Sequence, residues 1–244
     1  MFKYLLGSAA LATLLVGFAG PAGANPLPPG GSTGVPTGIP EGTIVASQTS
    51  AFDFTSTGGQ THVGTVQQEV VRTASGNLDF LYQVSFNSGS GTIGSFGVHN
   101  YAGFATDVIQ NTDGTVFQPG TTTRAPGNIF TTGTKTAIMA ERGLSGATIL
   151  YTLESALRAG QSSFVQIIQT DATLFDNKGV VDVNGGPQEG SFGINGTLEP
   201  LASGGPQIVP EPSTMAMWGG VALGLVGYMA VRRRKLASAA PQVA

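Results

Sequence analysis

Hard oxygen ligands cluster in one short stretch of this 244-residue chain. Asp176-Asn177-Lys178-Gly179 is followed closely by Asp182-Val183-Asn184-Gly185. Carboxylate and amide oxygens at close spacing suit Ca²⁺, which makes Asp176, Asp182 and Asn184 candidate ligands. However, the spacing differs from that of the helical calcium loop, and no glutamate occupies its last position. Because Asp, Asn and Gly are also the usual residues of hairpin turns, we predict no metal site and no cofactor.

A hydrolytic site needs a nucleophile and a base, and the chain offers few of either. Ser95, His99 and Asp107 supply the residue types of a catalytic triad, but no Gly-x-Ser-x-Gly turn accompanies them. Asp79 would need a second carboxylate from another strand to act as a glycosidase pair. The chain contains no cysteine and only two histidines, which excludes disulfides, thiolate zinc sites and multi-histidine sites within one chain. We therefore expect a protein without enzymatic activity.

The N-terminus has the organisation of a secretory signal peptide, which we predict over residues 1–24. Lys3 precedes an apolar run from Tyr4 to Phe18, and Ala22 and Ala24 provide the small side chains of a signal-peptidase cleavage site. The run of about 15 residues is shorter than the roughly 20 that a membrane-spanning helix needs. The chain is therefore expected to be exported and then cut by signal peptidase.

The C-terminus combines a charge-free apolar stretch with a basic cluster. Pro210-Glu211-Pro212 precedes residues 215–231, and Arg232-Arg233-Arg234-Lys235 follows them directly. About 17 apolar residues are at the lower limit of a membrane-spanning helix. Lys and Arg are retained on the cytoplasmic side, so the cluster stops transfer and Pro210 lies outside. We predict a transmembrane helix over residues 215–231 and a cytoplasmic tail over residues 236–244.

The order of these elements resembles the PEP-CTERM sorting signal. Val-Pro-Glu-Pro-Ser-Thr, which begins at Val209, is followed by a short apolar helix and an Arg-rich cluster, and the resemblance covers residues 210–235. The resemblance implies a protein of a Gram-negative-type bacterium and a substrate of exosortase, a multi-pass membrane enzyme that cleaves the tag and releases or transfers the protein. It also implies recognition at Pro210, Glu211 and Pro212. A permanent single-pass anchor with a chance Pro-Glu-Pro is the alternative.

The segment between the two tags is acidic. From Asn25 to Pro210, six basic and thirteen acidic side chains give a net charge of −7, which disfavours binding to nucleic acid. Residues 25–42 are rich in proline and glycine, which predicts a linker, and residues 201–209 form a similar spacer before the tag.

Residues 43–200 are predicted to form an all-β domain, an antiparallel β-sandwich with jelly-roll-like character. In Leu78–Phe86, apolar and polar residues largely alternate, as in a half-buried strand. The only helix candidate is short, Glu154–Ala159. Strand-like segments separated by Gly and Asn turns indicate a sandwich or barrel; they are Ile44–Gln48, His62–Thr73, Leu78–Phe86, Phe104–Ile109, Ala147–Leu153, Ser163–Thr170, Val180–Val183 and Ser191–Leu198.

We therefore expect an exported, non-enzymatic protein that resides transiently in the inner membrane and then at the cell surface or in the extracellular matrix. Its predicted partners are signal peptidase, exosortase and the membrane, with exopolysaccharide of a biofilm matrix as a further candidate. The alternative is a matrix module that binds Ca²⁺ or a neutral glycan. Exposed aromatic rings would serve the glycan, and Tyr82, Tyr101 and Tyr151 are the candidates.

Overall fold

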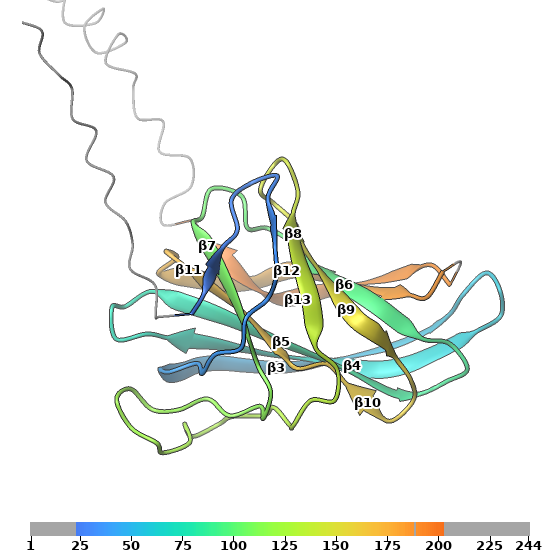
Figure 1. Ribbon diagram of the computed structural model, residues 1–244, viewed down its shortest axis with the longest axis horizontal. Helices are drawn as coiled ribbons and strands as arrows, with labels where there is room; N and C mark the ends of the chain where they lie inside the picture. Colours follow the sequence, from blue (N-terminus) through green and yellow to red (C-terminus); the bar gives the residue numbers. More distant parts are fainter. Residues whose placement is uncertain (1–22, 188, 203–244) are drawn as a thin grey trace, which may run out of the picture. The chain divides into compact units, whose positions relative to one another are not determined.

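The computed structural model describes residues 23–187 and 189–202, and every regular element in this part of the chain is a β-strand (Figure 1). This confirms the all-β prediction. The thirteen strands are β1 (Asn25–Pro26), β2 (Ser32–Thr33), β3 (Thr43–Thr55), β4 (Thr61–Arg72), β5 (Leu78–Ser88), β6 (Ile93–Val98), β7 (Thr106–Asn111), β8 (Ala137–Arg142), β9 (Ile149–Leu157), β10 (Gln161–Ser162), β11 (Val165–Thr170), β12 (Leu174–Gly185) and β13 (Ser191–Leu201).

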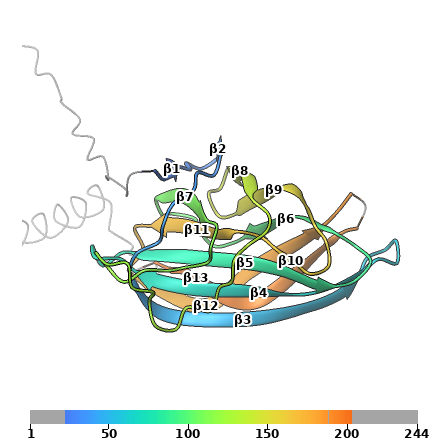
Figure 2. The ribbon, with the colours of Figure 1, turned by 60° about the horizontal axis from the view of Figure 1, so that its bottom comes forward.

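The strands form two antiparallel sheets. Sheet A has the order β1-β7-β11-β5-β4-β3, with β10 paired to β5, and sheet B has the order β13-β12-β6-β9-β8-β2. The chain changes sheet repeatedly, so that β11 lies between β5 and β7 while β6 lies between β12 and β9. Interleaved connections of this kind occur in Greek-key sandwiches and jelly rolls. A β-sandwich fits this arrangement, in which strands of the two sheets cross over one another (Figure 2).

The main apolar core is shared by the two sheets. Sheet A contributes Phe80 and Phe86 from β5, and sheet B contributes Phe96 from β6 and Tyr151 from β9; all four are fully buried. The rings of Phe96 and Tyr151 stack at 5.3 Å. Because the described chain has no cysteine to cross-link it, burial of such side chains is the main favourable term for the fold.

A second, smaller core lies on the outer face of sheet A. The β7–β8 connection (residues 112–136, green in Figure 1) brings Val116 and Phe130 against Val71 and Leu81 of the sheet. This cover buries both faces of the first seven residues of β5. The alternating sequence of β5 predicted one buried face only, and the long connection explains the difference.

Residues 25–42 are part of the β domain, so the linker prediction is wrong for this segment. β1 pairs with β7 through Asn25 and Val108, and β2 pairs with β8 through Ser32 and Glu141. Leu27, between them, is only 1 % exposed and belongs to the main core. Proline lacks an N–H and is confined to sheet edges, which is consistent with these two short edge strands.

All eight predicted strand segments correspond to strands of the structure, but with different ends. The prediction missed β6 and β8, as well as the three two-residue strands. The helix candidate Glu154–Ala159 was wrong, because β9 continues through Leu157, which is fully buried in the main core. Leu201, placed in the spacer, is the last residue of β13.

Candidate functional site

Polar side chains far apart in the sequence meet on the outward face of sheet B. His99, just after β6, lies between Asp182 of β12 and Thr148, just before β9. His99 Nε2 is 2.7 Å from Asp182 Oδ2, and Thr148 Oγ1 is 3.2 Å from His99 Nδ1. Asp182 offers an acceptor to His99 Nε2, whereas either the Thr148 hydroxyl or the ring can be the donor in the hydrogen bond at Nδ1.

This arrangement has the order hydroxyl, imidazole, carboxylate, which is also the order of a nucleophile, its base and an orienting acid. The side chains of His99 and Asp182 are 30 % and 37 % exposed. Further along the same strands, Asn184 Nδ2 donates to Ser95 Oγ at 3.1 Å. The face thus offers a row of hydroxyl, imidazole, carboxylate and amide groups that can hydrogen-bond to a polar ligand.

A groove of about 420 Å³ adjoins this row at the turn between β8 and β9. Thr148 lines it together with Glu141 and Leu150, and Gly30 and Gly31 line it from the segment between β1 and β2. Leu144, also in the lining, is 92 % exposed. The groove therefore combines polar groups with exposed apolar surface.

The three candidate calcium ligands do not come together. Asp182 pairs with His99 and Asn184 with Ser95, whereas Asp176 lies beyond a β-bulge in β12, opposite Glu199 of β13. Across residues 23–187 and 189–202, no group of three or more His, Asp or Glu side chains is placed to hold a metal ion. The three residues are close in the sequence, but the strand pairing gives each of them a different partner.

Asp176 and Glu199 form a pair of neighbouring carboxyl groups with opposite titration behaviour. Burial raises the pKa of Glu199, the hydrogen bond from Asn100 Nδ2 lowers it, and the adjacent Asp176 raises it again, with a net rise. The pKa of Asp176 is lowered, because hydrogen bonds and the charge of Lys178 outweigh the effect of burial. Asn100, which donates to Glu199, is the one described non-glycine residue with a positive φ, 71°.

The triad suggested by residue types is not assembled. Asp107 lies on β7 in sheet A, while Ser95 and His99 belong to the β6 region of sheet B. The real partners of His99, Thr148 and Asp182, are 49 and 83 residues away in the sequence and form no local motif. Asp79 is 3 % exposed, so a substrate cannot reach its carboxyl group.

The three tyrosines proposed as glycan-stacking residues are buried. Tyr82, Tyr101 and Tyr151 are at most 2 % exposed, and burial raises the pKa of all three hydroxyl groups. The hydroxyl groups of Tyr82 and Tyr101 are 2.7 Å apart, and Tyr82 donates to the carbonyl oxygen of Leu198. Their rings therefore cannot stack on a sugar at the surface.

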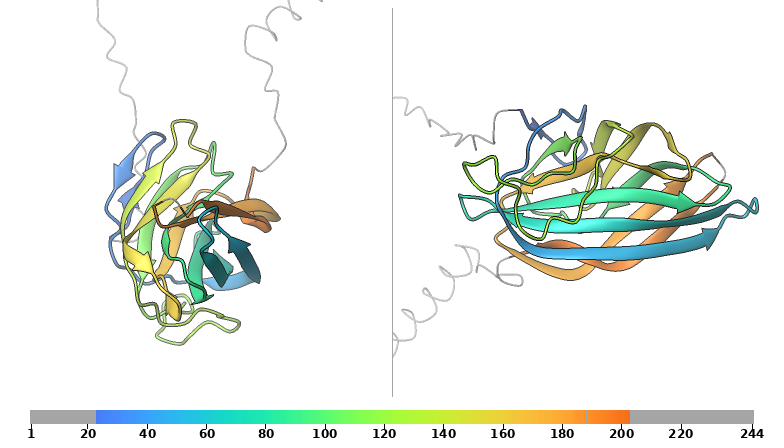
Figure 3. Two further views of the ribbon diagram at one scale, coloured as in Figure 1. Left: turned by 90° about the vertical axis from the view of Figure 1, so that its right-hand side faces the viewer. Right: turned by 90° about the horizontal axis from the view of Figure 1, so that it is seen from below.

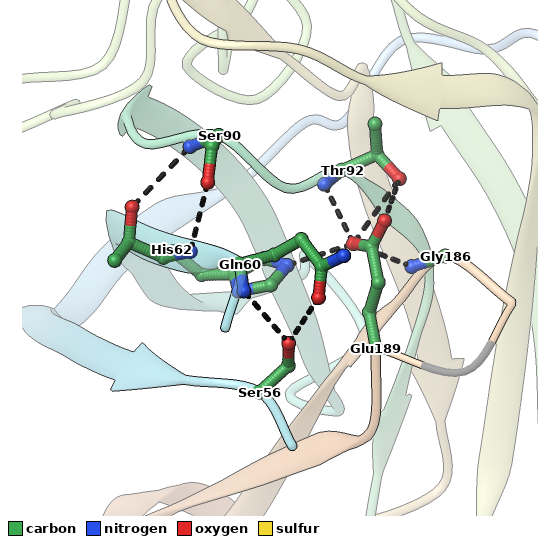
Figure 4. A network of polar contacts seen from close by, with 8 residues as sticks. Ser56, Gln60, His62, Ser90, Thr92, Gly186 and Glu189 are labelled. Carbon is green, nitrogen blue, oxygen red and sulfur yellow. Dashed lines mark hydrogen bonds and ion pairs between the residues drawn. The ribbon is translucent and has the colours of Figure 1, made fainter. Parts of the chain in front are cut away.

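A second polar cluster joins three loops at one end of the strands (Figure 4). His62 is fully buried, stacks on Phe54 at 4.3 Å and places Nε2 2.9 Å from Glu189 Oε2. Glu189 also accepts from the backbone N–H groups of Thr92 (2.7 Å) and Gly186 (3.1 Å). Burial would raise the pKa of Glu189, but these hydrogen bonds lower it below its usual value. This pairing joins β4 to the β12–β13 turn over a separation of 127 residues, so no local motif could predict it.

The predicted processing residues lie mostly outside the described residues. This applies to Ala22, Pro210, Glu211 and Pro212, to the predicted transmembrane helix 215–231 and to the stop-transfer residues Arg232, Arg233, Arg234 and Lys235. Ala24 is described; it directly precedes β1 and packs against the smaller core. No helix in the described ranges is long and apolar enough to cross a membrane.

The C-terminal segment nevertheless identifies the class of protein. The family model of the PEP-CTERM protein-sorting motif matches residues 209–235. Neither a curated protein nor a solved structure matches the chain. The chain therefore carries a PEP-CTERM protein-sorting motif, which indicates exosortase-dependent sorting of an exported protein to a surface or extracellular location.

Proposed function

We propose that this protein is a non-enzymatic component of the cell surface or extracellular matrix, and that exosortase cleaves it at the Pro-Glu-Pro sequence. The observation that carries the proposal is the PEP-CTERM protein-sorting motif at residues 209–235. On this view the β domain, a jelly-roll-like sandwich, is the delivered cargo. The C-terminal segment is a transient tag.

Each part of the tag has a physical role in this proposal. Proline fixes φ and disfavours helix at the preceding residue, so Pro210 and Pro212 keep the recognition site extended. Residues 215–231 hold the site at the outer side of the inner membrane, and Arg232–Lys235 stop transfer because Lys and Arg remain cytoplasmic. Cleavage then separates the domain from its one charge-free apolar C-terminal stretch.

The carboxyl groups that burial perturbs most in the described domain are not placed for catalysis. These groups, Glu69 and Asp79, are 1 % and 3 % exposed and are inaccessible to a substrate. The net charge of −7 between Asn25 and Pro210 favours solubility after release.

The test replaces Pro210, Glu211 and Pro212 with alanine in the exosortase-bearing host and follows the size and location of the product. The proposal expects an uncleaved chain that stays with the membrane fraction. Pro206→Ala with Gln207→Ala, in the spacer before the motif, is the matched control and should be cleaved normally. Release of the triple variant at the same mass as the product of the unaltered protein would contradict the proposal.

A second candidate function is binding of a neutral glycan along the outward face of sheet B. It is favoured by the groove beside Thr148, whose carboxylate, hydroxyl and leucine groups suit a polyhydroxylated chain. Calorimetry of the released protein with a neutral matrix polysaccharide, and separately with Ca²⁺, tests this candidate and the calcium alternative. Absence of heat in both titrations would rule out glycan binding and calcium binding. The remaining alternative, a permanent anchor, would be favoured if the mature protein retained residues 215–231.

A further inference from the structure

Strand β3 is a long sheet edge with one free side. Its 13 residues pair with β4 alone in sheet A. It is the outermost strand of that sheet in Figure 2 and in the right-hand view of Figure 3. A free edge presents a row of backbone N–H and C=O groups that another extended chain can pair with.

The other sheet edges are less available. β1 and β2 are two residues long, and β1 includes Pro26, which has no N–H to donate. β13 carries Glu199 and Pro200 near its end, and the carbonyl oxygen of Gly196 in its middle already accepts from Gln48 Nε2 of β3 at 2.8 Å. β3 is therefore the long edge with the fewest obstacles.

The residues of β3 lack most of the features that block pairing between edges. The strand contains no proline, lysine or arginine, and Asp53 is its one charged residue. A bulge between Ile44 and Ala46 interrupts the pairing with β4, which leaves a regular stretch from Ala46 to Thr55. Alternate residues along this stretch are exposed: Ser47, Thr49, Ala51, Asp53 and Thr55.

We propose that β3 pairs antiparallel with β3 of a second copy of this chain, about a twofold axis at Ala51. In this register Asp53 faces Thr49 of the other copy, so each carboxylate meets a hydroxyl, and Ser47 faces Thr55. An axis at Asp53 would place two carboxylates opposite each other, which is destabilising. An axis at Thr49 would place Asp53 opposite the bulged position.

The choice of a second copy follows from this self-complementarity. An isologous contact needs one surface that matches itself, and the regular stretch of β3 supplies that match in side-chain chemistry and in register. One strand pair buries less than the roughly 1,200 Å² of a stable interface, and the net charge of −7 opposes contact. The association is therefore weak in dilute solution and favoured where the protein is concentrated, as at a surface.

The absence of cysteine from the chain allows a direct test. Single cysteines are introduced into the full chain, purified in mild detergent, as Ala51→Cys, Thr49→Cys and Glu154→Cys. Residues directly opposite in an antiparallel pair have Cα atoms about 4.5–5.5 Å apart, within reach of a disulfide. The two Thr49 positions would be four residues apart along the pair, roughly 13 Å. Glu154 is exposed on β9, between two paired strands, and is the control.

Mild oxidation followed by mass analysis reports the fraction of disulfide-linked dimer. Ala51→Cys should give about five times more dimer than Glu154→Cys, because only a positioned pair meets the disulfide geometry. Thr49→Cys should stay near the control, and mixing it with Asp53→Cys should restore the dimer. All variants share the C-terminal segment, so that segment cannot produce the difference. Equal dimer at residues 51, 49 and 154, or a maximum at residue 49, would overturn the proposal.

Discussion

Arg142 places a positive charge inside the domain without an ion pair to a carboxylate among the described residues. It is 4 % exposed, and its guanidinium donates to backbone carbonyl oxygens and to one hydroxyl. These acceptors come from the β1–β2 segment, the β6–β7 loop, β7 and the β8–β9 turn: Leu27, Tyr101, Phe104, Thr106 and Gly146, at 2.7–3.1 Å. One side chain thus joins four segments of the chain by hydrogen bonds, with no disulfide available to cross-link them.

Replacing Arg142 with methionine should lower the free energy of unfolding by about 3 kcal/mol or more, because several buried carbonyl groups lose their donor at once. Denaturant unfolding of the full chain measures the change. Arg158→Met, at an exposed position after β9, is the control and should change the free energy by less than about 0.5 kcal/mol. Equal effects of the two substitutions would contradict this role of Arg142.

Glu69 and Asp79 should make the domain less stable as the pH rises. Burial raises the pKa of each carboxyl group to about 7, against hydrogen bonds from Ile129 and Gln169 that lower it. In the unfolded chain these groups lose their protons near pH 4. Between about pH 4 and 7 the folded state therefore holds more protons, and its stability falls as the pH rises through this window.

Unfolding at pH 5 and at pH 8 checks this expectation, with a loss of a few kcal/mol at the higher pH. Glu69→Gln with Asp79→Asn should remove most of the loss, since neither amide titrates. Glu154→Gln, at an exposed position, should leave it unchanged. A wild-type domain that is equally stable or more stable at pH 8 would show that these carboxyl groups are not protonated at pH 5.

The β7–β8 connection is held to sheet A by side chains that replace backbone pairing. Gln67 Nε2 donates to the carbonyl oxygen of Ile129, whose N–H donates to Glu69 Oε1. Gln83 Nε2 donates to the carbonyl oxygen of Thr131, whose N–H donates to Gln83 Oε1. Residues 129–131 are thus bonded almost as a further strand would be, although they belong to a loop.

Gln83→Leu should loosen this connection while leaving the two sheets in place. The substitution keeps the volume but leaves the backbone groups of Thr131 without partners, at a cost of about 1–3 kcal/mol. Hydrogen exchange should become faster over residues 129–131 and stay slow in β5 and β11. Gln118→Leu, in the same connection, is the control. Unchanged exchange at Thr131 would show that the apolar contacts of Phe130 suffice.

Element by element, the sequence was informative where a residue pattern is local. Leu78–Phe86 alternates, and its apolar residues do face the main core as β5. β6 (Ile93–Val98) contains two glycines, which weaken its strand pattern in the sequence. β1 and β2 have only two residues each and lie in a segment rich in proline and glycine, so the sequence pattern did not predict them. The row on sheet B could not be foreseen, because Thr148, His99 and Asp182 meet through the pairing of three strands.

For the whole molecule, the sequence indicates function most directly at the C-terminus and least directly in the β domain. The sorting motif is a contiguous pattern and was found as such at residues 209–235. The function of the domain depends on which strands become neighbours, and composition alone does not determine that. The fate of the C-terminal segment after export therefore decides whether the protein is sorted or stays anchored.

Intact-mass analysis of the mature protein, collected from the surface or medium of an exosortase-bearing host, tests that point most directly. If exosortase cleaves the tag, the protein ends near Pro210–Pro212 and lacks Trp218 and the cluster Arg232–Lys235. Each glycine among Gly219, Gly220, Gly224 and Gly227 forgoes side-chain burial worth about 0.8 kcal/mol per CH₂, which suits a transient tag. An intact Arg-rich tail in most mature molecules would contradict the account.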